Sequence, residues 1–580
     1  MTQSVIYSVS LDRRRRLLVR TPFEAADLMR RVPDARMWDA SLKVWVVTPS
    51  RVNVGYLRKT IPQLVWDRDA QDLGDDVLTR GTPPPRQSTD DYTFAERPPY
   101  AHQREGFALS RGAPAFALLM EQRTGKTRVL IDVASDLYLR SLIDTVLIIC
   151  PNSVKSVWEE QIPEWTPRHV PHEVVVYGAG DRKRVAEAMA APPAGLRWLV
   201  VNVEAFSTTR PRTKTQPPTG AAFIEELLEG RKTLGAIDEA TRIKTPGASR
   251  TKFILKLRDL LAYRRILTGT LITKTPLDAY CPFKFLDPAI LGFSSYYSFR
   301  NDVAIMGGYG GKQVIAYSPG ALERLAALIK PFSYRITRDQ CFDLPPKQYS
   351  KRIIELTAEQ RRVYESMRDK MAAELSSGQR VTAAIVLVQL LRLQQIVGGF
   401  IPDVLHAADA GNLPAVVAIP GPNPKLEALM EELEEIPHKV VIWARFRPEI
   451  ALIAARLRAA YGDATVVEFH GGVKEADRTV NRRRFQDLAD TCRFLVGQPG
   501  AGGLGIPLHA ARHVVYFSNS FSLEERLQSE DRTQGAEQQW SVDYLDIVAK
   551  DTNDLKILKT LRENKSIADL ISGDSWKEWI

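Results

Sequence analysis

MEQRTGKTRV, residues 120–129, lies between an apolar run at Ala115–Met120 and a segment, Arg128–Ala134, that begins a helical pattern. We therefore expect a buried strand, a tight turn and a helix, in that order. Such a turn aims several backbone N–H groups and the positive end of the helix dipole at one point, where a phosphate can bind. Lys126 would neutralise the β and γ phosphates of a nucleotide, and the hydroxyl of Thr127 would bind Mg²⁺.

Three neighbours, Thr124, Gly125 and Arg128, belong to the same predicted phosphate loop. The full phosphate-loop pattern has glycine where this chain has Met120, and a bare GKT also occurs in ordinary turns. The order of the motifs further along the chain favours a phosphate loop. It thereby predicts ATP and Mg²⁺ as cofactors.

A second motif, LGAIDEATRIK at residues 234–244, places Asp238 and Glu239 directly after an apolar run. A strand would carry both carboxylates to the sheet edge where phosphate-binding loops converge. One carboxylate can hold Mg²⁺ while the next orients the attacking water, so we assign Asp238 to the metal and both residues to catalysis. A surface Asp-Glu pair usually has no function. This pair, however, follows an apolar run and stands 112 residues after Lys126.

The composition indicates a globular chain of several domains. Its 580 residues are 44% hydrophobic, which predicts about three or four structural units with large cores. The net charge of +10 favours a polyanionic partner. Four cysteines, scattered singly, supply neither a disulfide framework nor a CxxC metal site, and no run of about 18 apolar residues could span a membrane. We expect a monomer without a membrane partner, in the cytoplasm, or in the nucleus if the source is eukaryotic.

The first 68 residues are predicted to form a small α+β domain. Two β-rich runs flank the arginines at 13–16, which we interpret as a basic hairpin turn in preference to a nuclear-localisation signal. A second hairpin is expected at Ala35–Pro49, where Trp38 and Trp45 flank a turn and would fill a small core.

From Pro98 onward, short apolar runs alternate with helical stretches, which is typical of parallel βα units. The segment 69–95 before them contains three consecutive prolines and a Ser-Thr-Asp-Asp run, so it is predicted to be an exposed linker. A later stretch, residues 403–423, is rich in glycine, alanine and proline and is predicted to be an exposed loop.

Several stretches resemble, in order, the motifs of Snf-type superfamily-two helicase-like ATPases: YAHQREGF at 100–107, CPNSVKSVWEE at 150–160, LTGT at 267–270 and LQSEDRTQGAEQ at 527–538. KVWVV at 43–47 resembles the HARP domain of annealing helicases. The resemblance implies an α/β fold of two RecA-like lobes, each a doubly wound parallel sheet, with helical insertions and the small N-terminal domain. It also implies ATP hydrolysis coupled to movement along double-stranded or branched DNA.

The resemblance assigns further site residues. Gln103 would read the adenine, and Gln528 and Arg532 would act in catalysis from the second lobe. In a glycine-rich loop, Gly503 and Gly505 would let the backbone approach the phosphates. Contacts to the DNA backbone are implied for Pro151, Asn152, Ser153, Lys155, Asn202, Thr268, Gly269, Thr270, Gly471 and Gly472.

The predicted domain order follows from these motifs. The HARP-like domain (1–68) and linker (69–95) precede a first lobe with an insertion (96–335), a helical protrusion and inter-lobe crossing (336–423), and a second lobe with C-terminal helices (424–580).

Two departures from the family pattern leave alternatives open. Gly535 stands where the family has a second arginine, and Leu271 stands where most relatives have proline. A nucleotide-binding scaffold with weak turnover therefore remains one alternative, and a helicase that separates DNA or RNA strands is another.

His470 has neither a nucleophile nor a set of metal ligands beside it in the sequence, so it is interpreted as a turn residue.

Overall fold

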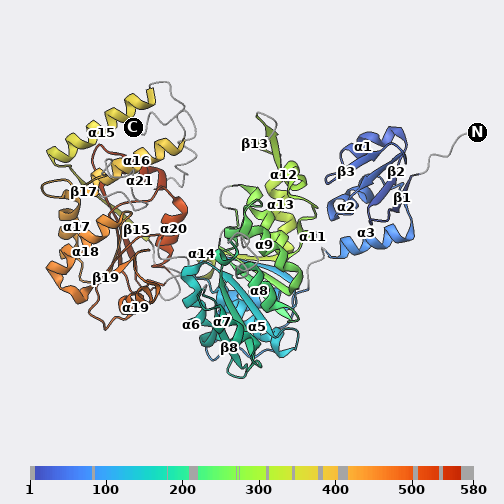
Figure 1. Cartoon of the computed structure of the whole chain (residues 1–580), viewed down its shortest axis with the longest axis horizontal. Helices are drawn as coiled ribbons and strands as arrows, with labels where there is room; N and C mark the ends of the chain where they lie inside the picture. The colour runs from blue at the N-terminus through green and yellow to red at the C-terminus, as the bar shows by residue number, and fades with distance from the viewer. Residues whose placement is uncertain are drawn as a thin grey trace, which may run out of the picture. The chain divides into compact units, whose positions relative to one another are not determined.

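A computed structural model describes residues 7–80, 85–178, 180–207, 220–269, 271–272, 275–308, 313–342, 347–376, 383–402, 416–500, 507–534, 538 and 540–562. The chain forms two compact units, Met1–Thr337 and Arg338–Ile580, and Figure 1 labels many of their helices and strands. No helix among these residues is both long and apolar enough to cross a bilayer.

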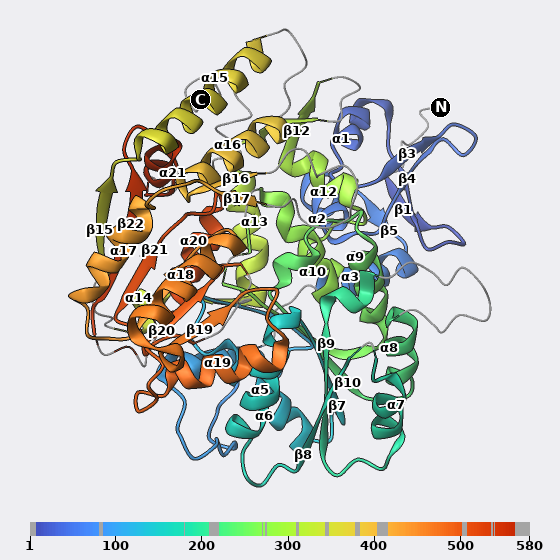
Figure 2. The ribbon, with the colours of Figure 1, turned by 60° about the vertical axis from the view of Figure 1, so that its left-hand side comes forward.

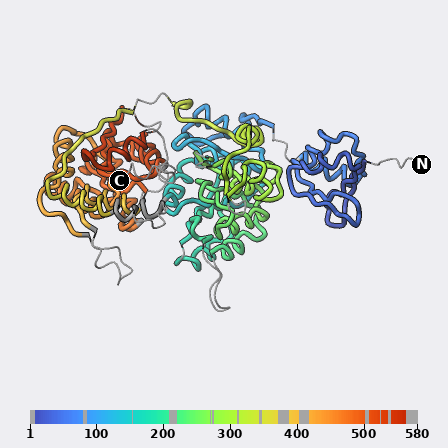
Figure 3. Tube along the Cα trace, turned by 90° about the horizontal axis from the view of Figure 1, so that it is seen from above, coloured from blue at the N-terminus to red at the C-terminus, as the bar shows by residue number. Residues whose placement is uncertain are grey.

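The N-terminal domain is a five-stranded sheet in the order β3-β4-β2-β1-β5, drawn in blue in Figure 3. The predicted basic hairpin is confirmed, since β1 and β2 pair antiparallel and Asp12 accepts hydrogen bonds from the backbone N–H groups of Arg14 and Arg16. The elements are β1 (Ser8–Leu11), β2 (Leu17–Arg20), α1 (Ala26–Arg30), β3 (Arg36–Asp39), β4 (Val44–Val47), α2 (Arg51–Thr60), β5 (Val65–Trp66) and α3 (Arg68–Arg80).

Two expectations for this domain were wrong in part. Trp38 is 45% exposed and meets Trp45 edge to face, with 5.3 Å between ring centroids. Trp45 does pack against the core, which aliphatic side chains such as Val9 and Leu57 fill. Residues 69–80 belong to helix α3 and not to a linker. Ala70 is fully buried in the domain core with Val77 against it, so the apolar spacing of this segment outweighs its polar composition.

A buried carboxylate joins the N-terminal domain to the rest of the first unit. Asp34 accepts hydrogen bonds from the backbone N–H of Ser294 at 2.7 Å and from its hydroxyl at 2.8 Å. Asn53 accepts from the Asp34 backbone N–H at 2.8 Å and so fixes this residue from its own domain. The domain is therefore docked on the first lobe and not merely tethered to it.

The first lobe is built on a seven-stranded parallel sheet in the order β14-β6-β11-β10-β7-β9-β8. Along β6, alternate residues enter two different cores, because successive side chains of a strand point to opposite faces. The strands are β6 (Ala115–Met120), β7 (Thr145–Cys150), β8 (His172–Val176), β9 (Leu196–Asn202), β10 (Thr233–Asp238), β11 (Leu261–Leu267) and β14 (Ser333–Ile336).

Helices cover both faces of this sheet, as a doubly wound fold requires. The core that contains Phe116 and Leu118 is covered by α4 (Ala101–Ser110), α5 (Lys126–Leu139) and α6 (Lys155–Trp165). The opposite core is covered by α7 (Arg182–Ala190), α8 (Gly220–Leu228), α9 (Ser249–Leu257), α10 (Tyr280–Leu286), α11 (Pro288–Leu291), α12 (Tyr296–Val303) and α13 (Ala321–Ile329). A small hairpin, β12 (Ala304–Gly307) and β13 (Gln313–Tyr317), follows α12.

The second unit holds a six-stranded parallel sheet in the order β15-β22-β21-β18-β20-β19, whose orange and red strands are visible in Figure 2. Its strands are β15 (Lys347–Ile354), β18 (Val440–Trp443), β19 (Val466–Phe469), β20 (Phe494–Gly497), β21 (His513–Tyr516) and β22 (Val542–Ala549). Its helices are α14 (Arg338–Cys341), α15 (Ala358–Ser376), α16 (Ala383–Val397), α17 (Pro424–Glu434), α18 (Arg447–Tyr461), α19 (Glu475–Gln486), α20 (Leu523–Asp531) and α21 (Asn553–Arg562).

The segment 336–423 differs in part from the expected protrusion and crossing. Strand β15 lies within it and forms the edge of the second sheet. Thr357 caps the start of α15, because its hydroxyl accepts from the Gln360 N–H at 3.2 Å. Most of the predicted loop 403–423 lies outside the described residues, but Val416–Ala418 forms β17 and pairs with β16 (Phe400–Pro402).

Candidate functional site

The predicted strand, turn and helix around the phosphate loop are confirmed. β6 is buried throughout and is followed by a turn in which both the N–H and the hydroxyl of Thr124 donate to the Glu121 carbonyl, at 3.3 and 2.8 Å. Gly125 has φ 91°, a left-handed conformation that favours glycine, and α5 begins at Lys126. The first N–H groups of a helix have no partner within it, so this turn can present them to an anion.

Helix α4 holds the turn from behind. Gln103 Nε2 donates to the Thr124 carbonyl at 3.2 Å, and a Cβ on Gly125 would lie only 2.0 Å from that nitrogen. His102 Nε2 lies 2.8 Å from the same carbonyl and must carry the proton, because a carbonyl can only accept. Burial lowers the pKa of His102, while its hydrogen bond to the Thr124 carbonyl acts in the opposite direction. The sequence interpretation missed His102, whose only signal was its place beside Gln103.

The two predicted carboxylates, Asp238 and Glu239, lie at the carboxyl end of a strand, as the sequence predicts. Asp238 is the last residue of β10, and its Oδ2 accepts a hydrogen bond from Trp158 Nε1 at 3.0 Å. Its Oδ1 accepts from the Glu239 N–H at 3.1 Å, and Glu239 has φ 54°. Burial raises the pKa of Asp238, and the charge of Lys126 acts in the opposite direction. Lys126 is therefore close enough to Asp238 for the two to interact electrostatically.

The LTGT turn meets the phosphate loop directly. β11 lies between β6 and β10 in the sheet, and the Thr268 N–H donates to the Leu118 carbonyl of β6 at 3.2 Å. A Cβ on Gly269 would lie 3.3 Å from both Gln122 N and Glu121 Cα. Glycine thus allows the two turns to touch. Thr270 lies outside the described residues.

Other residues assigned to DNA contact lie at the same edge of the sheet. Pro151 and Asn152 follow β7, and Lys155 starts α6, where its Nζ donates to the Tyr177 carbonyl at 3.3 Å. Asn202 ends β9, opposite Cys150 of β7. These predicted contacts thus follow two neighbouring strands. Of Ser153, the structure describes only the backbone.

Arg128 is the exception among the loop residues. Its Nε donates to Asp132 at 3.0 Å, its Nη2 donates to the Arg97 carbonyl at 2.8 Å, and its guanidinium lies 4.5 Å from the ring centroid of Trp165. The side chain is buried in these contacts. Its assignment to the nucleotide is therefore wrong for the guanidinium, and the acidic residue four positions later on α5 was the sequence signal for the internal pair.

In the second unit, Arg532 is buried. It is 3% exposed, Nη2 donates to the Pro499 carbonyl at 2.6 Å, and the guanidinium lies 5.2 Å from the ring centroid of Trp443. This burial lowers its pKa to about 10. Gln528 is half-buried on α20. Arg532 therefore contacts the interior of its own lobe, whereas the resemblance implied a residue that acts in catalysis.

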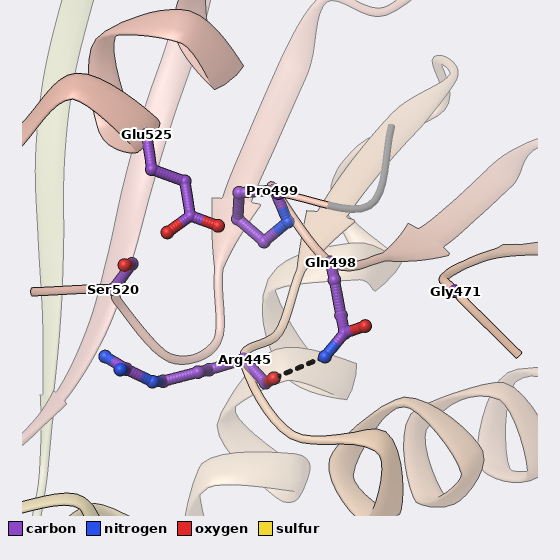
Figure 4. A pocket seen from close by; sticks show the side chains of 7 residues that line it. Arg445, Gly471, Gln498, Pro499, Ser520 and Glu525 are labelled. Carbon is purple, nitrogen blue, oxygen red and sulfur yellow. Dashed lines mark hydrogen bonds between the residues drawn. The ribbon is translucent and has the colours of Figure 1, made fainter. Parts of the chain in front are cut away.

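A cavity of about 410 Å³ opens at the carboxyl ends of the second sheet's strands (Figure 4). Arg445 lies on one wall with its guanidinium 4.4 Å from the ring centroid of Phe521, and Gln498 Nε2 donates to the Arg445 carbonyl at 2.7 Å. The sequence interpretation missed Arg445. The cavity is lined by Arg445, Gly471, Gln498, Pro499, Gly500, Ser520 and Glu525.

Of the remaining assigned residues, Gly472 is exposed beside this cavity's Gly471, and its N–H donates to His470 Nδ1 at 3.1 Å, as expected of a turn histidine. Gly503, Gly505 and Gly535 lie outside the described residues.

Two parallel α/β lobes, the first with a phosphate loop beside an Asp-Glu pair, define the class of helicase-like ATPases. The SNF2-related domain matches residues 38–398, which is more than half of the chain, and the helicase conserved C-terminal domain matches residues 424–535. The chain belongs to the SNF2-related family.

Similar proteins come from bacteria, eukaryotes and archaea. An uncharacterized ATP-dependent helicase, MG018 of Mycoplasma genitalium, is 23% identical over 80% of this chain and 41% of its own length. The TATA-binding protein-associated factor MOT1 of Saccharomyces cerevisiae is 24% identical over 77% of this chain and 26% of its own. The chain thus spans less than half the length of these relatives. A Sulfolobus solfataricus SWI2/SNF2 ATPase core, solved with double-stranded DNA, aligns with 84% of this chain and 97% of its own at 24% identity and a TM-score of 0.35.

Proposed function

We propose that the chain is an ATP-dependent double-stranded DNA translocase that remodels branched DNA, by annealing or fork regression, in replication, recombination or repair. The contact between the Gly269 turn and the phosphate loop carries this proposal. A turn assigned to DNA contact and a loop assigned to phosphate share one edge of one sheet. A conformational change in the phosphate loop can therefore be passed to the Gly269 turn, or the reverse, through this backbone contact.

The residues at this edge fit Mg²⁺·ATP. The left-handed Gly125 lets the Gln103 amide pack against the turn, and Lys126, Thr127 and Asp238 offer an ammonium, a hydroxyl and a carboxylate at the same edge of the sheet. These are the groups that phosphate-loop ATPases use for phosphates and magnesium. When bound, Mg²⁺ would neutralise charge on the β and γ phosphates.

The protein's own groups would then divide the work. Lys126 would hold the phosphates, and Glu239, displaced from the strand by its positive φ, would orient the attacking water with its carboxylate. His102 and Gln103 would keep the turn fixed through the Thr124 carbonyl. A preorganised turn need not rearrange as charge develops in the reaction.

Phosphate contacts at the strand ends would grip DNA without reading its sequence. Lys155 in the first unit and Arg445 beside the second unit's cavity are two cations that we assign to such contacts. Contacts of this kind position a protein on the duplex but carry little sequence information.

An ATPase assay on the purified chain tests the proposal. We expect hydrolysis that duplex DNA stimulates, irrespective of its base sequence. Glu239→Gln should bind ATP but fail to turn it over, because the phosphate clamp stays and the water-orienting carboxylate is lost. Turnover that ignores DNA would contradict the translocase, and a wild-type rate in Glu239→Gln would contradict the site.

The preference for branched DNA rests on the N-terminal domain. Arg13, Arg14 and Arg15 are exposed on the first hairpin turn, and Trp38 is an exposed ring on an edge strand. Cations and stacking rings together suit DNA that has unpaired bases at a junction. Since Asp34 docks this domain on the first lobe, the domain would hold a junction at a fixed place relative to the motor.

Point substitutions test this part better than removal of a docked domain. Arg14→Gln and Trp38→Ala should each lower fork regression several-fold and leave duplex-stimulated ATP hydrolysis unchanged. Arg30→Gln is the matched control, because Arg30 lies in the same domain but already pairs with Asp27 at 2.7 Å. Equal fork regression in all three variants would place the DNA-structure preference in the lobes.

The burial of Arg532 favours one second candidate, a nucleotide-binding scaffold with weak turnover. Both functions predict ATP binding. Only the translocase predicts that DNA accelerates hydrolysis, so the same ATPase assay distinguishes them. Displacement of a strand from a tailed duplex would instead identify a strand-separating helicase.

A further inference from the structure

Trp158 connects a core helix to the carboxylate assigned to magnesium. Its indole is 2% exposed and belongs to the core beneath α5 and α6. The one polar atom of the indole, Nε1, donates a hydrogen bond to Asp238 Oδ2 at 3.0 Å. Asp238 lies on the same face of β10 as the buried Leu234 and Ala236, so its carboxylate would otherwise meet apolar surroundings.

The two hydrogen bonds to Asp238 constrain it in complementary ways. The bond from the Glu239 N–H to Oδ1 is local and follows the backbone of β10. The bond from Trp158 to Oδ2 spans 80 residues and comes from another element. The first bond alone leaves the carboxylate free to turn about its side-chain torsions, whereas a second donor on the other oxygen fixes the plane of the group. An indole N–H can only donate, so this partner also favours the ionised carboxylate.

We propose that Trp158 is a positioning residue that holds Asp238 in the orientation needed to bind Mg²⁺. Groups that hydrogen-bond to a metal-binding carboxylate orient it and tune its affinity for the metal. The role of Trp158 is thus more than filling space in the core. The inference rests on the ATPase function proposed above, in which Asp238 binds the metal.

The chain offers a matched control. Trp198 on β9 is fully buried in the same core, but its Nε1 has no hydrogen-bond partner among the residues that the structure describes. Trp158→Phe and Trp198→Phe therefore remove rings of the same kind from the same core. Only the first removes a donor from Asp238.

The test is the Mg²⁺ dependence of nucleotide binding, measured at equilibrium with a fluorescent, non-hydrolysable ATP analogue on the full chain. We expect Trp158→Phe to need about tenfold more Mg²⁺ than wild type for half-maximal tight binding, the lower end of what loss of such a partner costs. Trp198→Phe should match wild type, and binding without Mg²⁺ should be equal in all three proteins. Thermal unfolding and circular dichroism check that both variants fold.

A shape-preserving replacement covers the case in which Trp158→Phe does not fold. Benzothienylalanine at position 158 keeps the two fused rings and exchanges the N–H for sulfur, so it removes the donor alone. It should give the same shift in Mg²⁺ requirement. A requirement equal to that of Trp198→Phe would overturn the role of Trp158. Wild-type protein that binds no nucleotide even with Mg²⁺ would instead contradict the proposed ATPase function.

Discussion

The carboxyl edges of the two sheets use similar residues for different purposes. In the first unit, polar groups converge on a turn. Gln103 and His102 both form hydrogen bonds with the Thr124 carbonyl, and the charge of Lys126 acts against the burial that raises the pKa of Asp238. In the second unit, arginines and carboxylates bind one another in the interior. Arg526 is an example, with Nη1 donating to Asp546 at 2.6 Å and Nε to Glu530 at 2.8 Å.

The difference shows that a motif's residue types do not reveal which way its side chains point. Asp238 and Glu239 end a strand, and the strand's direction alone brings them to the edge. Arg526 and Arg532 lie on or just after helix α20, where side-chain contacts decide between interior and surface. If this comparison is right, substitutions at the first edge should change catalysis, and those at the second should change stability as well.

Lys126→Ala should have the largest effect. The ammonium beside the loop is assigned to the transferred phosphates, and loss of one such electrostatic group costs about 10²- to 10³-fold in kcat. Stability should stay near wild type. Steady-state ATP hydrolysis with and without duplex DNA measures the effect. Lys183→Ala is the control, because Lys183 is 92% exposed and its pair with Glu187 at 3.9 Å contributes little.

Arg532→Ala should lower stability together with kcat. It removes a buried side chain, leaves the Pro499 carbonyl without this donor and opens space beside Trp443. Such losses cost about 3–4 kcal/mol, or roughly 6–15 °C in the Tm of a domain of this size. Loss of kcat with an unchanged Tm would contradict this difference between the two sheet edges, because Arg532 would then act like the residues of the first edge.

The contrast also explains what could be predicted from the sequence. Strands such as Ala115–Met120 were predictable because a short run of apolar residues bounded by turns is typical of a buried strand. A carboxylate at the end of such a strand was predictable too, because the direction of the strand fixes where it lies. Trp158 and His102 were not, since their partners lie 80 and 22 residues away and only the packed fold brings them together. Helix α3 was missed because a proline-rich stretch of sequence directly follows it, and the whole segment was therefore predicted to be a linker despite the helical spacing of its apolar residues.

Glu449 offers a pH test confined to the second unit. The carboxyl group is fully buried at the start of α18, where Oε2 accepts from the Ser518 hydroxyl at 2.5 Å and from the Phe446 N–H at 3.2 Å. Burial raises its pKa from 4.5 to about 7, while Lys425 opposes the shift and Asp554 adds to it. The folded state therefore holds a proton that the unfolded state has lost between about pH 4.5 and pH 7.

Because the pKa of Glu449 is higher in the folded state, the protein should lose stability as the pH rises. The contribution of Glu449 to stability is present below about pH 4.5 and is lost as the pH rises through about 7. Glu449→Gln removes the titration, so at pH 8 the variant should be more stable than wild type by about 2–3 kcal/mol, with little gain at pH 5. Tm measured across this range tests it against Glu434→Gln, an exposed change on α17. A gain that does not depend on pH would show that Glu449 does not titrate there.

The smallest effect is expected for the DNA contacts, and here the two edges should behave alike. Lys155→Gln in the first unit and Arg445→Gln in the second would each remove one cation placed for a phosphate. Each should weaken duplex binding a few-fold and lower the slope of log affinity against log salt by about 0.9, because one fewer counterion is released. Fluorescence anisotropy over a series of salt concentrations measures that slope, with Lys183→Gln as control. If Lys155→Gln lowers the slope and Arg445→Gln does not, the cavity of the second unit lies away from the duplex, and the two edges differ in their DNA contacts too.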